Sequence, residues 1–334
     1  MFVNAIRRLG QSQIDTYPAF DIRATPVYAA ITIGGALTLF FVVIGGFRFS
    51  DPFMAIPAAW CIGLFGAGLL ARRYGHPSVG GACEAIGLVY SQGLLIESCL
   101  PMLTFYSAPL VDSRLAQADA LLGFDWVAFV TFFGGSRLAL QFAGVLYMSF
   151  LWQAAAILII LFAIGLDGRA WRFVAAAAIA LLITVALYPF APAVGAFVHF
   201  GIGPRDYPNL NTRTPWSFAP AIHAMKSGTK VITWKLMVGY VSFPSYHAAS
   251  ALLFTWAAWP LRRVRWFFLF INVGMAASAM IIGAHYLIDL IAGALVALLA
   301  LWAAGEILDR LSTGDVVPCT GSLFPSITRS PDSV

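Results

Sequence analysis

The chain has 334 residues, of which 60% are hydrophobic and only 10% are charged. Its mean hydropathy of +0.83 excludes an ordinary soluble domain and is typical of a polytopic membrane protein. The formal net charge of +5 is modest, and no nucleic-acid-binding motif accompanies it. The four cysteines show no paired or metal-like spacing, so neither a disulfide nor a zinc site is expected from them.

Long runs without charged residues predict an all-α bundle of about eight transmembrane helices. The expected spans are 26–47, 52–71, 84–105, 138–165, 171–192, 244–260, 266–284 and 285–308. We interpret residues 1–83, with the first two spans, as an addition to a six-helix core over 84–310. The tail at 311–334 is rich in Ser, Thr, Pro and Gly and is expected to be disordered.

Arginines in the predicted loops fall on one side of the membrane when the eight spans alternate in direction. They are Arg7, Arg8, Arg23, Arg72, Arg73, Arg169, Arg172, Arg262, Arg263, Arg265 and Arg310. Because cytoplasmic loops carry an excess of Lys and Arg, this side is predicted to be cytoplasmic, and both termini are predicted to lie there.

Two predicted loops on the opposite side are long. Residues 112–122 are expected to form a short interfacial helix, with leucines on its apolar face and Asp112 and Asp119 on the opposite face. The segment 193–240 contains one acid and several cations, namely Arg205, Arg213, Lys226, Lys230 and Lys235. Such a segment favours an anionic partner such as a phosphate group, and the alternative is a solvated loop near lipid head groups.

Three ionisable side chains lie at the ends of the last apolar stretches. His247 is near the start of the sixth predicted span, and His285 begins the eighth, four residues before Asp289. On a helix this spacing places His285 and Asp289 on one face. The carboxylate can then hold one imidazole nitrogen and leave the other free as a nucleophile or base. Both spans start from the same predicted side, so the three groups are expected at one depth; the alternative is a purely structural His–Asp hydrogen bond.

These residues carry a resemblance to a known family. The patterns Pro244-Ser245-x-His247 and His285-x-x-x-Asp289 resemble the second and third signatures of the type 2 phosphatidic acid phosphatase superfamily. The longer runs FPSYHAA and HYLIDLIAG resemble more closely the branch that contains fungal inositol phosphorylceramide synthase. The runs GFDW at 123–126 and YMS at 147–149 resemble bacterial members, which implies a bacterial inner-membrane protein.

The chain departs from the phosphatase pattern at two places. The first signature, K-x6-R-P, is absent, and the nearest match is Arg205 followed by Arg213-Thr214-Pro215. The third signature of the phosphatases begins with Ser-Arg, whereas this chain has Ser278 and Ala279. The synthase-like branch also lacks a clean Ser-Arg, so this loss favours a transferase over a plain phosphatase.

The resemblance implies a lipid phosphotransferase that needs neither metal nor cofactor. It would act at the non-cytoplasmic face on a phospholipid or lipid phosphate, with a lipid hydroxyl as acceptor. His285 would form a phosphohistidine, Asp289 would stabilise the imidazolium, and His247 would serve as acid and then as base. The expected phosphate-binding residues are the helix-capping Ser245 together with Arg205, Arg213, Lys226 and Lys230.

Three alternatives stay open at this point. Water could replace the lipid acceptor, which would make the protein a phosphatase for phosphatidate or a polyprenyl diphosphate. The missing arginine is also compatible with an inactive lipid-binding or transport protein. Zinc could bind the two histidines and the aspartate, although the carboxylate suits an orienting role better. The sequence specifies neither the donor and acceptor lipids nor the oligomeric state.

Overall fold

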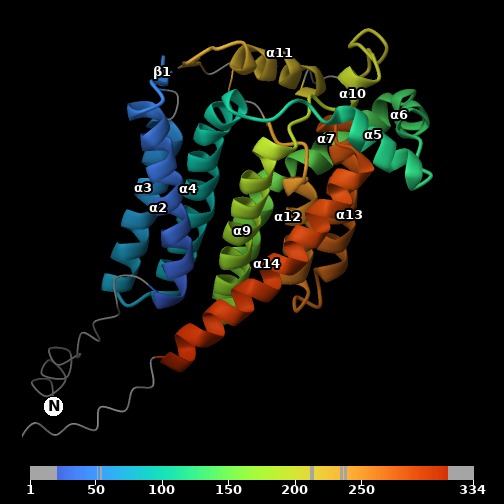
Figure 1. The fold of residues 1–334 in the computed structure, drawn as a ribbon. Helices are drawn as coiled ribbons and strands as arrows, with labels where there is room; N and C mark the ends of the chain where they lie inside the picture. Colours follow the sequence, from blue (N-terminus) through green and yellow to red (C-terminus); the bar gives the residue numbers. More distant parts are fainter. Residues whose placement is uncertain are drawn as a thin grey trace, which may run out of the picture.

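The computed structural model describes residues 21–50, 52, 55–210, 214–233, 236 and 239–314. Its architecture is an α-helical bundle (Figure 1). The long helices are α2 (Thr25–Val43), α3 (Ala55–Arg73), α4 (Pro77–Phe105), α9 (Asp167–Leu187), α13 (Arg265–Ile282) and α14 (Leu287–Gly314). The shorter ones are α5 (Asp112–Leu121), α6 (Trp126–Gly134), α7 (Arg137–Met148), α8 (Phe150–Ala163), α10 (Ala196–His199), α11 (Thr214–Lys226) and α12 (Tyr246–Ala258), with 3₁₀ turns at Ile22–Ala24 and Tyr188–Phe190.

Six described helices are long and apolar enough to cross a membrane, and the number rises to eight if each of two bent pairs is one span. The pair α5–α6 bends by 89° and the pair α7–α8 by 48°. The prediction of an all-α, multi-pass bundle is therefore confirmed. The predicted helix 138–165 is broken at Ser149, whose hydroxyl donates to the carbonyl of Leu146 at 2.5 Å and accepts from the Gln153 amide at 2.9 Å.

The predicted span 244–260 is shorter than expected. Helix α12 has only 13 residues and packs against α8, α9, α13 and α14. Its buried positions are mostly alanine, and small residues let neighbouring helices approach closely. Because protein covers it, α12 has no need to match the thickness of the hydrocarbon layer.

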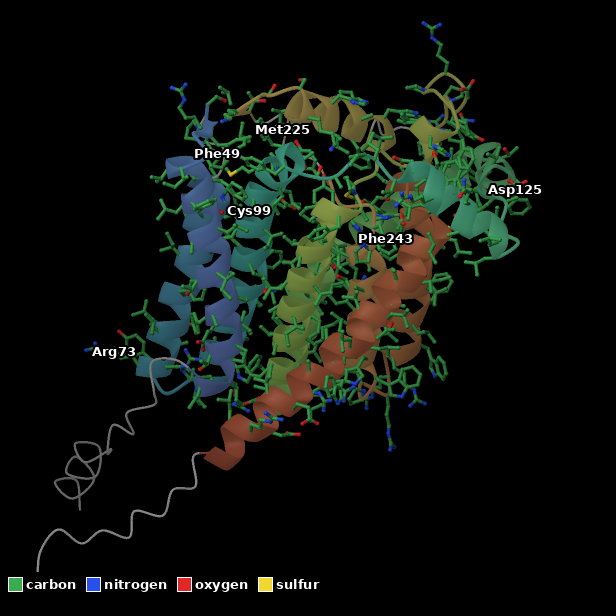
Figure 2. The ribbon with its side chains drawn as sticks, in the orientation of Figure 1. Phe49, Arg73, Cys99, Asp125, Met225 and Phe243 are labelled. Carbon is green, nitrogen blue, oxygen red and sulfur yellow. The ribbon has the colours of Figure 1, made fainter. Side chains whose placement is uncertain are left out.

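Different segments of the chain lie at the two ends of the bundle. The first and last described segments lie at one end, while α5, α6, α10, α11 and β1 gather at the other (Figure 1). Arg73, at the end of α3, lies at the first of these ends, opposite to Asp125 and Met225 (Figure 2). Which end faces the cytoplasm stays a prediction from the arginine distribution.

The predicted interfacial helix at 112–122 forms as α5, but the prediction of which face is exposed was wrong. Asp112 and Asp119 are 6% and 2% exposed, whereas Leu121 is 90% exposed. The predicted solvent face therefore points into the protein. The reason is that both carboxylates accept hydrogen bonds from main-chain amides of neighbouring segments, which satisfies buried acids that would otherwise be costly.

The N-terminal helices pack on the rest of the bundle. Helix α2 contacts α4 and α9, and α3 contacts α4. Glu84 on α4 accepts a hydrogen bond from Tyr28 at 2.7 Å and forms an ion pair with Arg72. In the described part of the chain, the only strands are β1 (Arg48–Phe49) and β2 (Val231–Ile232), which pair in parallel and tie the α2–α3 connection to the long 193–240 segment.

The C-terminal helix extends further than predicted. Helix α14 continues to Gly314, so the first residues of the predicted disordered tail are helical. The rest of that tail, at 315–334, lies outside the described residues. The predicted boundary between an N-terminal addition and a catalytic core stays a prediction.

Candidate active site

The start of α12 is fixed against α14. Ser245 is the N-cap of α12, and its hydroxyl accepts a hydrogen bond from the amide of Ala248 at 3.3 Å. The Ser245 amide in turn donates to the carbonyl of Asp289 at 2.9 Å. Gly293 permits this close crossing, because a Cβ at that position would lie 2.2 Å from the Ser245 carbonyl oxygen. The first turns of α12 and α14 therefore form one unit.

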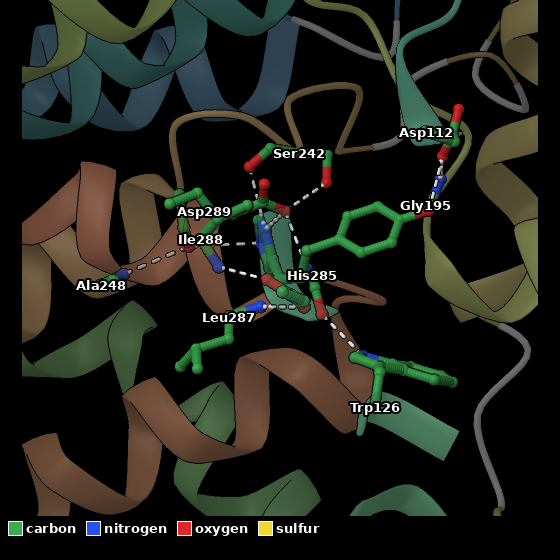
Figure 3. A network of polar contacts seen from close by, with 12 residues as sticks. Asp112, Trp126, Gly195, Ser242, Ala248, His285, Leu287, Ile288 and Asp289 are labelled. Carbon is green, nitrogen blue, oxygen red and sulfur yellow. Dashed lines mark hydrogen bonds and ion pairs between the residues drawn. The ribbon is translucent and has the colours of Figure 1, made fainter. Parts of the chain in front are cut away.

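His285 is held through one ring nitrogen (Figure 3). Its Nδ1 lies 3.0 Å from the carbonyl oxygen of Ser242 and 3.4 Å from Oδ2 of Asp289. Both groups are acceptors, so Nδ1 carries the proton and Nε2 keeps its lone pair. Nε2 faces the hydroxyl of Ser245 at 3.4 Å. The arrangement gives His285 an oriented nucleophilic nitrogen.

Asp289 is oriented by its own hydrogen bonds. Its Oδ2 accepts from the Ser242 hydroxyl at 2.7 Å and from the Tyr286 amide at 2.9 Å. The residue is fully buried. His285 precedes α14, which begins at Leu287, so a turn rather than the predicted helical face brings the two side chains together. In that turn Ala284 adopts a φ of +57°.

His247 completes the cluster from the first turn of α12. Its ring centroid is 6.2 Å from that of His285. The imidazole stacks on Tyr147 with centroids 4.2 Å apart and lies 4.8 Å from the Phe150 ring. Two imidazoles at this separation can both reach substituents of a single phosphorus atom. The structure thus brings together His247, His285, Asp289 and Ser245.

Helix α5 and Trp126 clamp the segment that carries His285 (Figure 3). Asp119 accepts hydrogen bonds from the amides of Leu287 at 2.9 Å and Ile288 at 2.8 Å, and thereby caps the start of α14. The indole of Trp126 donates to the carbonyl of His285 at 2.9 Å. The backbone of the candidate nucleophile is therefore fixed on both sides.

Asp112 extends this clamp to the segment before α10. It accepts hydrogen bonds from the amides of Val194 at 3.1 Å and Gly195 at 3.0 Å, and from the Tyr286 hydroxyl at 3.0 Å. Burial and the Asp112 carboxylate raise the pKa of the Tyr286 phenol, which therefore remains a donor. Gly195 has a φ of +96° and lies close to Ala284, so a larger residue there would disturb the turn before His285.

Sequence reasoning missed four residues of this network. They are Ser242, Asp112, Asp119 and Trp126. For the two aspartates a signal existed, because a spacing of seven places them on one face of a short helix. From sequence alone this spacing predicts a face exposed to solvent. Ser242 contacts His285 through its main-chain carbonyl oxygen, so no pattern of side chains in the sequence could identify it as a site residue.

Two of the predicted phosphate-binding cations, Lys226 and Lys230, donate hydrogen bonds to main-chain carbonyls of other segments. Lys226 donates to the carbonyls of Ser107 at 3.1 Å and Ala108 at 2.7 Å, and burial lowers its pKa. Lys230 donates to the carbonyl of Gly45 at 3.0 Å. Arg205 is exposed, and the fourth predicted cation, Arg213, lies outside the described residues. Among the described residues, Arg205, Lys226 and Lys230 form no hydrogen bond or ion pair with either histidine or with Asp289.

An apolar cavity of about 370 Å³ adjoins His247. Its walls come from α3, α4, α8, α9 and α12 and from residues 239–241. The polar side chains along it include Tyr90, Glu97, Thr184 and Tyr240. In the part of the chain that the structure describes, no group of three or more His, Cys, Asp or Glu is placed to hold a metal ion.

Asp119→Asn is expected to lower kcat about 10- to 100-fold with little change in KM. An asparagine has a single acceptor oxygen, so one of the two α14 amides loses its partner and the His285 backbone is less well held. Steady-state kinetics on the purified variant measure kcat and KM separately. The matched control is Asp125→Asn, because Asp125 caps the exposed start of α6 and asparagine caps equally well. Equal kinetics for the two variants would contradict the positioning role.

The comparison with protein families gives one match. A family model described as the PAP2 superfamily matches residues 113–303, which is more than half of the chain. The matched region runs from α5 into α14 and contains Asp119, Ser245, His247, His285 and Asp289. Comparisons with curated proteins and with solved structures gave no match.

Proposed function

The chain belongs to the PAP2 superfamily, and we propose that it is an integral-membrane lipid phosphotransferase of the inositol phosphorylceramide synthase-like type. Members of this superfamily are generally phosphatases or phosphotransferases, and the long apolar helices make this chain a multi-pass membrane protein. The observation that carries the proposal is the orientation of His285. Its Nδ1 is held by the Ser242 carbonyl, its Nε2 faces the Ser245 hydroxyl, and the His247 ring centroid is 6.2 Å away.

The proposed reaction has two displacements at phosphorus. In the first, the Nε2 lone pair of His285 forms a P–N bond while the bond to the leaving oxygen breaks, and protonated His247 gives that oxygen its proton. In the second, His247 removes the proton of an acceptor hydroxyl. The acceptor oxygen then bonds to phosphorus, and the P–N electron pair returns to His285.

The surroundings of His285 suit the charge that develops on it. As Nε2 bonds to phosphorus the ring becomes cationic, and Nδ1–H donates to the Ser242 carbonyl and the Asp289 carboxylate. The first amides of α12 lack intrahelical acceptors and lie beside Ser245, where they can bind phosphoryl oxygens with help from the helix dipole. No metal or cofactor has a role in this scheme.

The orientation is part of the proposal. The site lies at the end of the bundle opposite to the arginine-rich helix ends, so we place it on the non-cytoplasmic side with both termini in the cytoplasm. A bacterial inner membrane is the proposed location. Arg205 stays a proposed phosphate ligand, and so does Arg213, which lies outside the described residues.

Hydrolysis is the second candidate, because it uses the same phosphohistidine. The buried Ala279, where the phosphatase signature has arginine, leaves one phosphate ligand missing. The apolar cavity beside His247 provides a place for a lipid acceptor. These two observations favour transfer over hydrolysis.

Both the reaction and its side can be tested in sealed right-side-out membrane vesicles supplied with a membrane-impermeant, short-chain phospholipid labelled in its head group. We expect a new labelled phospholipid to appear without any permeabilising step. Release of the head-group phosphate as a water-soluble product would favour the hydrolase. Turnover confined to inside-out vesicles would contradict the proposed orientation, and no turnover in either preparation would favour a non-catalytic lipid-binding protein.

A further inference from the structure

We propose that the cavity beside His247 is the binding site of the acceptor lipid, and that Glu97 and Thr184 recognise a second hydroxyl group on that lipid. The inference rests on the proposed phosphotransfer, because only a transferase needs a lipid acceptor. It adds a substrate class, namely a neutral long-chain alcohol with a further hydroxyl along its chain.

The cavity has the size and walls of a ligand site. Its volume of about 370 Å³ falls in the usual range for small-molecule pockets, and apolar side chains form most of its wall. Phe150 and Phe254 line it together with His247, so the apolar wall reaches the candidate acid and base. A hydrocarbon chain lying in this cavity would present its terminal hydroxyl to His247.

Two polar groups in this wall have no partner within the described residues. Glu97 lies inside the α4 span, is exposed at the cavity, and makes no hydrogen bond or ion pair with any described residue. Thr184 on α9 is 1% exposed, and its hydroxyl has no hydrogen-bond partner in the described part of the protein. A carboxyl inside a span and a buried unpaired hydroxyl are both costly, which indicates that a ligand satisfies them.

The chemistry of these groups selects the ligand. A carboxylate accepts hydrogen bonds, and a threonine hydroxyl both donates and accepts. A ligand hydroxyl that reaches this part of the cavity wall can therefore donate to Glu97 or accept from Thr184, and both residues line the same cavity. No Lys or Arg is among the described residues that line the cavity, so it suits the uncharged acceptor rather than the phosphorylated donor.

The test is photoaffinity labelling of the His285→Asn variant in lipid nanodiscs, because binding is then separated from turnover. The probes are long-chain primary alcohols with a diazirine near the far end. One series carries a second hydroxyl at increasing distances from the first, and the matched probe lacks it. We expect at least one diol to label α4 or α9 about tenfold more strongly than the matched alcohol.

The variants Glu97→Leu and Thr184→Val are expected to abolish this preference while labelling by the simple alcohol persists. Thr32→Val is the matched control, since Thr32 is exposed and its hydroxyl donates to the carbonyl of Tyr28 at 2.9 Å. Size-exclusion profiles check that each variant is folded. Equal labelling by all probes, or an unchanged preference in both variants, would overturn the inference. A preserved preference in a protein that shows no phosphotransfer would instead overturn the proposed function.

Discussion

The His285→Asn variant is expected to form no phosphoenzyme and to lose turnover by about 10⁴-fold or more. The asparagine amide can still donate to the Ser242 carbonyl, which His285 Nδ1 contacts at 3.0 Å. It offers no nucleophilic nitrogen in place of Nε2. The variant should therefore keep its fold and lose only the covalent step.

This expectation is measured by brief exposure to phosphorus-labelled lipid followed by denaturation. The wild-type protein should carry a label that is lost in acid and stable in alkali, as a phosphohistidine is. The matched control is His223→Asn, because His223 is exposed on α11 and has no role in the proposed site. Normal turnover, or the same acid-labile label, in His285→Asn would exclude His285 as the nucleophile.

The His247→Gln variant is expected to lower phosphotransfer between lipids by about 10²–10⁴-fold. Glutamine is polar but has no proton that titrates near neutral pH, so it can neither protonate the leaving alkoxide nor deprotonate the acceptor. The loss of activity in this variant should depend on the leaving group of the substrate. This dependence separates a role in proton transfer from a role in packing against Tyr147 and Phe150, which the ring contacts.

A lipid nitrophenyl phosphate diester provides the comparison. Nitrophenolate leaves without a proton, so phosphoenzyme formation should be nearly normal in His247→Gln. The second step still requires deprotonation of the acceptor. The expected time course is therefore a burst of nitrophenol release followed by slow turnover. An equal loss with the nitrophenyl ester and with the natural type of ester would show that His247 acts on binding or folding instead.

The helical class could be predicted from sequence, and so could three of the side chains that the structure brings together in the candidate site. Charge-free runs of about 20 residues have few alternatives to a membrane helix. His247, His285 and Asp289 are conspicuous because ionisable groups are rare in such stretches. Each of these inferences depends on local composition, which the chain carries without reference to its neighbours.

The inward face of α5 could not be predicted in the same way. Asp112 and Asp119 look like the polar face of an interfacial helix, and Leu121 looks like its anchor. In the structure the carboxylates bind main-chain amides before α10 and at the start of α14. Hydropathy periodicity indicates which side chains are polar, but it does not indicate which main-chain amides, distant in sequence, need a hydrogen-bond acceptor.

The long cationic segment shows the same limitation. Its lysines are predicted to bind phosphate because they break the expected charge distribution. Lys226 and Lys230 instead donate to the carbonyls that end or follow other helices, at Ser107, Ala108 and Gly45. An ammonium group satisfies a free carbonyl as readily as a phosphate, and only the tertiary contacts distinguish the two uses.

By itself the sequence determined an all-α membrane protein with two histidines and an aspartate as its chemically distinctive groups, because hydropathy and rare buried charges are properties of short segments. The tertiary structure decided that α12 is a short covered helix, that Ser242 and Asp289 share the Nδ1 proton of His285, and that α5 faces inward. These features depend on hydrogen bonds between main-chain groups and side chains that are far apart in sequence. Such bonds follow from the packing of the whole bundle, since most buried polar groups in a folded protein have a hydrogen-bond partner.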